Sequence, residues 1–167
     1  MSHQAEPGEP SKRVCEVRLK MVDYDPNLIG RVFEVTDPVP VTEQMVEEFC
    51  QATGESGLLY TDTEAAKHGP YGTVVAPPSF AVTFRNGRQF FEHIPRFGRQ
   101  GFDAGKDVEF VAPIRPGDRI TLSSHVKEIY EKTGRTGSMV FVVVRSTLKN
   151  QNDQIVAHVD HRFMNRP

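Results

Sequence analysis

A carboxylate and a phenol lie five residues apart in the segment TGESGLLYTD, residues 53–62. The carboxylate of Glu55 could take a proton from water and activate it as a nucleophile. The phenol of Tyr60 could donate a hydrogen bond to a carbonyl oxygen, although a pKa near ~10 makes it a poor proton shuttle at neutral pH. Each residue also has a structural explanation: Glu55 could bind backbone N–H groups at a helix end, and Tyr60 could pack with its hydroxyl group satisfied.

Basic side chains gather in the middle of the chain. They are Arg85, Arg88, Arg96 and Arg99. Guanidinium groups bind phosphate in bidentate geometry, so these residues could hold a phosphorylated ligand. Exposed arginines are common, and a solvated helix end explains them equally well.

The histidines and cysteines do not predict a metal site. His68 lies on a turn, which favours an exposed surface residue. His158 and His161 are an odd number of residues apart on one expected strand, which places them on opposite faces. Cys15 and Cys50 have neither metal-ligand spacing nor the pattern of a disulfide framework. We expect no metal and no cofactor.

Helical patterns come first along the chain and strand patterns follow. Thr42 is a good N-cap and Gly54 a good stop signal, which predicts a helix over 43–53. A helical turn over 62–67 and a long apolar helix over 79–94 are expected next. Alternating residues predict strands at 31–35, 39–41, 106–111, 118–130, 138–149 and 154–164. This order favours an α+β fold in which a curved antiparallel sheet wraps around the long helix.

The bulk composition is that of an ordinary globular domain. The chain has 167 residues, 38% hydrophobic and 25% charged, which fits one domain. A net charge of −2 gives a nucleic-acid role no electrostatic support. No apolar run is long enough for a membrane span, and the first residues lack the apolar core of a signal peptide. We expect a disordered tail over 1–13, a single domain over 14–167 and a cytoplasmic location.

Four short motifs carry a family resemblance. They are ATGE, YTDTEAAKHGPYG, VAPPSF and FVAPIRPGD, at residues 52–55, 60–72, 75–80 and 110–118. In this order and spacing the chain resembles the MaoC-like dehydratases, especially their divergent N-terminal-type or fatty-acid-synthase-like branch. The resemblance covers roughly residues 28–165 and implies the hot-dog fold, with a long central helix inside a curved antiparallel sheet.

The resemblance also implies positions for an active site. The family motif Gly-Asp-x-Asn-Pro-x-His supplies an Asp and a His for proton transfer. Glu55 stands at the position of that Asp, and Tyr60 at the position of that His. A backbone N–H at the start of the central helix serves the thioester oxyanion in the family. Pro78 falls at that point and has no N–H, so Ser79 is the expected donor. Arg85 and Arg88 are the expected contacts for coenzyme A or pantetheine phosphates.

The implied function is that of a lyase subunit. The family adds water to a 2-enoyl thioester or removes it from a 3-hydroxyacyl thioester, and is (R)-specific. Because the Asp/His pair is degenerate here, we expect catalysis to need a partner hot-dog subunit, in a heterodimer or a homodimer that binds acyl-CoA or an acyl-carrier thioester. A non-catalytic acyl-CoA-binding protein is the alternative. A thioesterase is disfavoured, because residues 79–91 contain no Asp or Glu.

Overall fold

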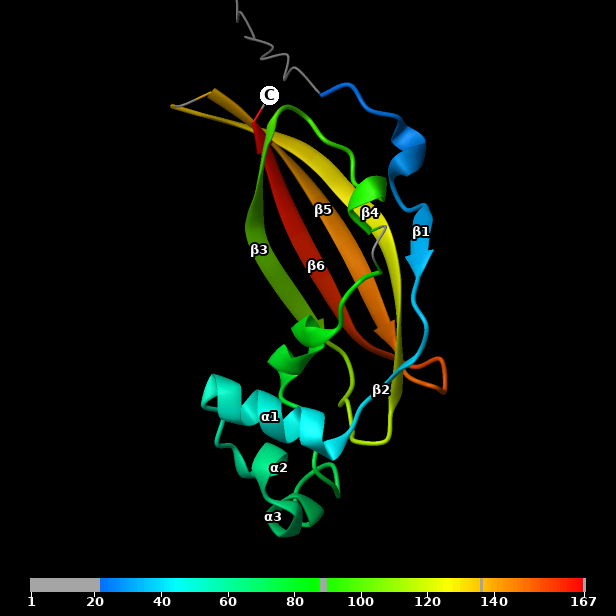
Figure 1. Cartoon of the computed structure of the whole chain (residues 1–167), viewed down its shortest axis with the longest axis vertical. Helices are drawn as coiled ribbons and strands as arrows, with labels where there is room; N and C mark the ends of the chain where they lie inside the picture. The colour runs from blue at the N-terminus through cyan, green and yellow to red at the C-terminus, as the bar shows by residue number, and fades with distance from the viewer. Residues whose placement is uncertain (1–21, 88–89, 136, 167) are drawn as a thin grey trace, which may run out of the picture.

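The chain is built on an antiparallel sheet that carries short helices at one end (Figure 1). The computed structural model describes residues 22–87, 90–135 and 137–166, so the expected N-terminal tail lies outside the described residues. The α-helices are α1 (Glu43–Thr53), α2 (Leu58–Thr61) and α3 (Thr63–Lys67), and the 3-10 helices are η1 (Pro26–Leu28), η2 (Pro78–Thr83) and η3 (Phe90–His93). The strands are β1 (Val32–Val35), β2 (Val39–Pro40), β3 (Gln100–Phe110), β4 (Arg119–Gly134), β5 (Gly137–Lys149) and β6 (Ile155–Arg166).

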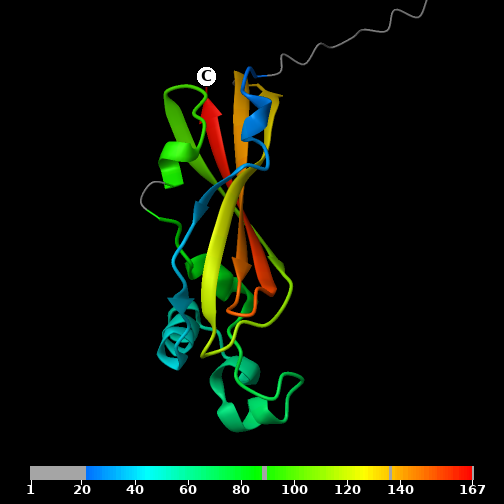
Figure 2. The ribbon, with the colours of Figure 1, turned by 90° about the vertical axis from the view of Figure 1, so that its right-hand side faces the viewer.

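The strand order is β1-β4-β5-β6-β3, and β2 also pairs with β4. Figure 2 shows that the long central strands twist along their length. Burial alternates along them: Ile120, Leu122 and Val126 of β4 are buried with polar neighbours between them, which is the period of a strand with one face on the core. All six strands expected from the sequence are present, and β3 begins six residues earlier than its pattern predicts.

Helix α1 forms where its capping signals predict. The Thr42 hydroxyl oxygen accepts a hydrogen bond from the Met45 N–H at 3.1 Å. Gly54 ends the helix in the left-handed conformation, with a φ of 71° that favours glycine. The helical turn expected at 62–67 is α3, and the Asp62 carboxylate caps it. These helices lie at one end of the sheet in both views.

The prediction of a long helix over 79–94 is wrong. The chain instead makes the short helices η2 and η3, and the backbone is already extended at Phe84, directly after η2. Two tertiary contacts hold this connection: the Asn86 side chain accepts a hydrogen bond from Ser124 at 2.8 Å, and the Gly87 N–H donates to Glu34 at 2.7 Å. Asn86 and Gly87 are poor helix formers, so this segment has only a weak preference for a helix. The two tertiary hydrogen bonds outweigh that preference.

The segment from η2 to η3 still covers the inner face of the sheet. Phe80 and Phe84 pack in one buried cluster with residues of β4, β5 and β6, such as Leu148. Phe90 and Ile94 pack in a second cluster with Val126, Val142 and Val144. An irregular apolar segment therefore takes the place that the sequence gives to the long helix.

Candidate active site

Glu55 and Tyr60 line the same cavity. Its volume is about 450 Å³, and we call it the α1–α2 cavity. Its walls come from α1, from the connection to α2, from residues 73–74 and from Pro116. The size falls within the ~300–1,000 Å³ range of small-molecule sites. The structure therefore brings together the two residues that the sequence places at the centre of the chemistry.

The Glu55 carboxylate bonds to its own loop. Its Oε1 accepts a hydrogen bond from the Gly57 N–H at 3.0 Å, and the side chain is half-buried. Burial, and then the negative charge of Glu55, raise the pKa of the neighbouring Cys50 thiol. Cys50 is therefore a protonated core side chain near neutral pH rather than a reactive thiolate.

Tyr60 is half-buried and packs against the core cluster that contains Phe80. Gly57 lies directly against its ring. A Cβ atom on Gly57 would lie 2.9 Å from Cε2 and 3.0 Å from Cδ2 of the ring, and 3.3 Å from Oε1 of Glu55. The absence of a side chain at Gly57 thus leaves room beside it for both the Glu55 and the Tyr60 side chain.

Replacing Gly57 by alanine should displace the Tyr60 ring and lower the free energy of unfolding by about 1–2 kcal/mol, because overpacking forces neighbours to move. Urea denaturation measures this. Gly134→Ala is the matched control, since its Cβ would meet only Met139 at 3.5 Å, an ordinary contact. Equal stability of the Gly57→Ala protein and the parent would contradict the close packing described here.

The other expected site residues lie elsewhere. Ser79 is exposed on the six-residue helix η2 and does not line the α1–α2 cavity. Arg85 is exposed and lines a different cavity of about 540 Å³. Arg88 lies outside the described residues. Among the described residues, neither Ser79 nor Arg85 lines the cavity that holds Glu55 and Tyr60.

No histidine is among the residues that line the α1–α2 cavity within the described ranges. His68, the nearest in sequence to Tyr60, is exposed, and its Nδ1 lies 2.9 Å from the backbone oxygen of Glu64 in its own helical turn. The cavity therefore offers three carboxylates, those of Glu43, Glu47 and Glu55, a phenol and a mixed polar and apolar wall, but no imidazole suited to proton transfer near neutrality among its described lining residues.

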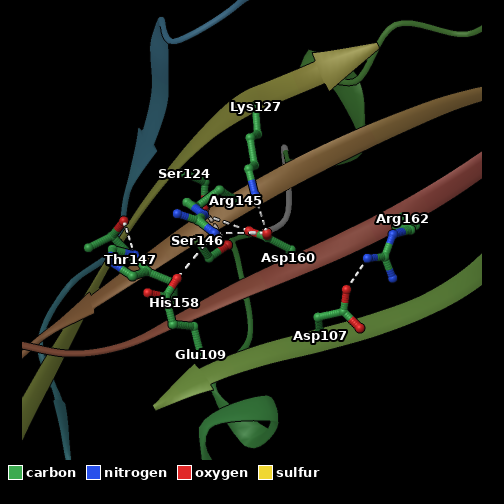
Figure 3. Close-up of polar contacts among 10 residues, drawn as sticks. All are labelled: Asp107, Glu109, Ser124, Lys127, Arg145, Ser146, Thr147, His158, Asp160 and Arg162. Carbon is green, nitrogen blue, oxygen red and sulfur yellow. Dashed lines mark hydrogen bonds and ion pairs between the residues drawn. The ribbon is translucent and has the colours of Figure 1, made fainter. Parts of the chain in front are cut away.

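A cluster of charged side chains joins three neighbouring strands of the sheet (Figure 3). The Asp160 carboxylate accepts hydrogen bonds from Arg145 Nε at 2.7 Å and from Lys127 Nζ at 2.6 Å. Burial alone would raise the pKa of Asp160, but these hydrogen bonds and positive charges outweigh burial and lower it. The cations that hydrogen-bond to the Asp160 carboxylate come from β4 and β5. We therefore interpret this cluster as a structural contact that joins β4, β5 and β6.

Sequence reasoning missed one pairing of acid–base side chains. His161 of β6 and Asp103 of β3 are 58 residues apart, and Nε2 of the ring lies 2.9 Å from Oδ2 of the carboxylate. Only the β3–β6 register brings them together, so no local motif signals the pair.

Among the residues that the structure describes, no group of three or more His, Cys, Asp or Glu side chains is arranged to hold a metal ion. No helix in the described ranges is both long and apolar enough to cross a membrane.

Known proteins share this sequence pattern and fold. Residues 27–159 match the family described as "FAS1-like, dehydratase domain region". A UPF0336 protein of Streptomyces avermitilis is 34% identical over 115 residues, which cover 66% of this chain and 76% of that protein. A probable enoyl-CoA hydratase alpha subunit of Thermomonospora curvata is 28% identical over 135 residues, 71% of this chain and 42% of that protein.

A solved structure supports the same fold. A chain of the C-terminally truncated HadBC (3R-hydroxyacyl-ACP dehydratase) complex from Mycobacterium tuberculosis matches with a TM-score of 0.68 at 21% identity, over 83% of this chain and 97% of that one. This confirms the antiparallel hot-dog architecture expected from the sequence, although the long helix inside the sheet is replaced by η2 and η3. The chain belongs to the family of FAS1-like dehydratase domains, and its fold is that of the hot-dog proteins.

Proposed function

We propose that this chain is the substrate-binding subunit of an (R)-specific 2-enoyl-thioester hydratase or 3-hydroxyacyl-thioester dehydratase. The observation that carries the proposal is the α1–α2 cavity, which lies at the family's motif and holds Glu55 and Tyr60 but no imidazole among the described residues that line it. A second hot-dog subunit then supplies the Asp/His pair.

The reaction explains why the missing imidazole matters. In hydration, water adds across the C2–C3 double bond: its oxygen bonds to C3, a base removes one of its protons, and an acid delivers a proton to C2. The Glu55 carboxylate uses Oε1 to accept from Gly57 and keeps Oε2 as an available base, but a tyrosine pKa near ~10 makes Tyr60 a poor partner for proton exchange. The geometry thus supports binding better than turnover by this chain alone.

The sheet also offers a place for a partner. Strand β3 lies at one edge of the sheet, and nearly all of its residues are exposed. Phe110 is exposed at its end, and Val111 follows directly. A strand edge with unpaired backbone groups and apolar side chains favours pairing with another sheet. The HadBC complex provides a precedent of a 3R-hydroxyacyl-ACP dehydratase built from two subunits.

The test is to assay hydration of crotonyl-CoA by the purified chain, alone and together with a hot-dog subunit encoded next to it. We expect little turnover alone and a rise of at least ~100-fold in the mixture, the scale of general acid–base catalysis. Strong activity of the chain alone that survives both Glu55→Ala and Tyr60→Phe would refute this assignment of the chemistry.

A non-catalytic thioester-binding protein is the second candidate. The hydrogen bond between the Glu55 carboxylate and the Gly57 N–H favours it, because a carboxylate engaged with its own loop is less available as a base. This candidate predicts binding of a coenzyme A ester, measured by calorimetry, with no turnover in the presence of any hot-dog partner.

A further inference from the structure

A second cavity lies at the end of the sheet far from α1–α3. It is formed by η3 and the segment after it, the start of β3 and the end of β6, and we call it the β3–β6 cavity. Figure 1 shows these elements together at the end of the sheet opposite α1–α3. Its volume is about 390 Å³, and it shares no lining residue with the α1–α2 cavity. Its apolar walls include the rings of Phe91, Phe102 and Phe163. This is enough apolar surface to hold a small hydrophobic group.

A buried amide opens into this cavity. Asn165 is only 6% exposed, yet it lines the β3–β6 cavity, and no hydrogen bond engages its side chain within the described part of the chain. The amide is thus open to the cavity and free to donate to or accept from a ligand bound there. Gly101 lies beside this amide, since a Cβ there would be 3.9 Å from Oδ1 of Asn165.

The His161–Asp103 pair forms another wall. The imidazole lies over Phe163 with 4.0 Å between ring centroids, and its side chain is 15% exposed. The hydrogen bond from the Gly105 N–H, and then that with His161, lower the pKa of Asp103. Burial lowers the pKa of His161, and Asp103 offsets this only in part. At pH 7 the carboxylate is therefore charged and accepts, so Nε2 of a neutral ring donates to it and Nδ1 is left as an acceptor.

Exposed arginines give the opening of the β3–β6 cavity a positive charge. Arg96 and Arg99 line the cavity and are exposed, and the one carboxylate that lines it, Asp103, is already engaged by Gly105 and His161. Two guanidinium groups beside an apolar chamber favour an anion that carries a hydrophobic tail.

We propose that the β3–β6 cavity binds an amphipathic organic anion, with its apolar tail against the phenylalanine rings and its carboxylate or phosphate between the Asn165 amide and Arg96 and Arg99. His161 lies beside the bound anion and senses it. This site is separate from the α1–α2 cavity, so it does not depend on the proposed function.

The test is calorimetry on the full chain with octanoate, octyl phosphate and uncharged octanol. We expect both anions to bind at least ten times more tightly than octanol, and the tighter anion identifies the head group. Arg96→Gln/Arg99→Gln should weaken both anions at least tenfold. The exposed pair Arg31→Gln/Arg119→Gln, which removes the same charge elsewhere, should leave binding unchanged.

NMR spectra of the parent chain test the same site without any arginine substitution. The His161 ring signals in NMR spectra should shift on addition of either anion, and Glu55→Gln should bind both anions like the parent chain. The proposal is overturned if octanol binds as tightly as octanoate, if the Arg31/Arg119 pair matters as much as Arg96/Arg99, if the His161 signals do not move, or if Glu55→Gln abolishes binding.

Discussion

Replacing Phe80 by alanine should lower the free energy of unfolding by about 4 kcal/mol, the usual cost of a cavity left by a buried phenylalanine. Phe80 is 1% exposed. Its ring makes edge-to-face contacts with Phe49 of α1 at 5.4 Å and with Phe84 at 5.6 Å between centroids. The substitution thus loosens the contact between the α1 region and the sheet as well as the core itself.

Chemical denaturation with guanidinium measures this loss. Phe102→Ala is the matched control, since the Phe102 side chain is 47% exposed on the edge strand and its loss should cost less than about 1 kcal/mol. Phe80→Leu keeps much of the volume and should recover more than half of the stability. Equal losses for Phe80→Ala and Phe102→Ala would show that the segment after Pro78 does not pack on the sheet as described.

Replacing Asp160 by asparagine should lower the free energy of unfolding by about 2–3 kcal/mol at pH 7. The substitution leaves Arg145 and Lys127 without their shared carboxylate, and breaking a buried pair usually costs about 3–5 kcal/mol. We expect less here because the Lys127 side chain is 37% exposed. Asp107→Asn is the matched control: Asp107 pairs with Arg162 on the same face, but its side chain is 59% exposed (Figure 3). An exposed pair should contribute below about 1 kcal/mol.

The same cluster predicts a pH dependence. Folding lowers the pKa of Asp160 below its value in the unfolded chain, which is near ~3.9. The ionised carboxylate therefore contributes its full share of the folding stability above about pH 4, and this share is lost as the pH falls through the lower pKa of the folded state. The stability difference between the parent and Asp160→Asn should therefore narrow below about pH 4. A difference that stays constant from pH 7 to pH 3 would contradict the role given to the ionised carboxylate.

Local signals in the sequence predict much of this fold. Thr42 and Gly54 determine the ends of α1, and alternation predicts β4, β5 and β6 within a few residues, because capping and period-two burial act over short distances. The segment after Pro78 shows where such reasoning fails. Its phenylalanine spacing fits a helix, but hydrogen bonds from Ser124 to Asn86 and from Gly87 to Glu34 join residues far apart in sequence.

The candidate site was predictable only in part. Glu55 and Tyr60 lie close in sequence and do share a cavity. Ser79 was expected at the start of a long helix, and without that helix it is exposed away from the cavity. The pairing of His161 with Asp103 depends on a strand register that includes a shift between Asp103 and Lys106, which no local pattern reveals.

In the proposed division of labour, this chain binds an acyl thioester while a partner subunit performs the proton transfer. The most direct measurement is crotonyl-CoA hydration by the reconstituted two-subunit complex, with one substitution at a time. Changing the motif histidine of the partner to alanine should reduce turnover at least ~100-fold, whereas Tyr60→Phe in this chain should change it less than about threefold. The reverse result, a large loss with Tyr60→Phe and little effect of the partner's histidine, would contradict the claim.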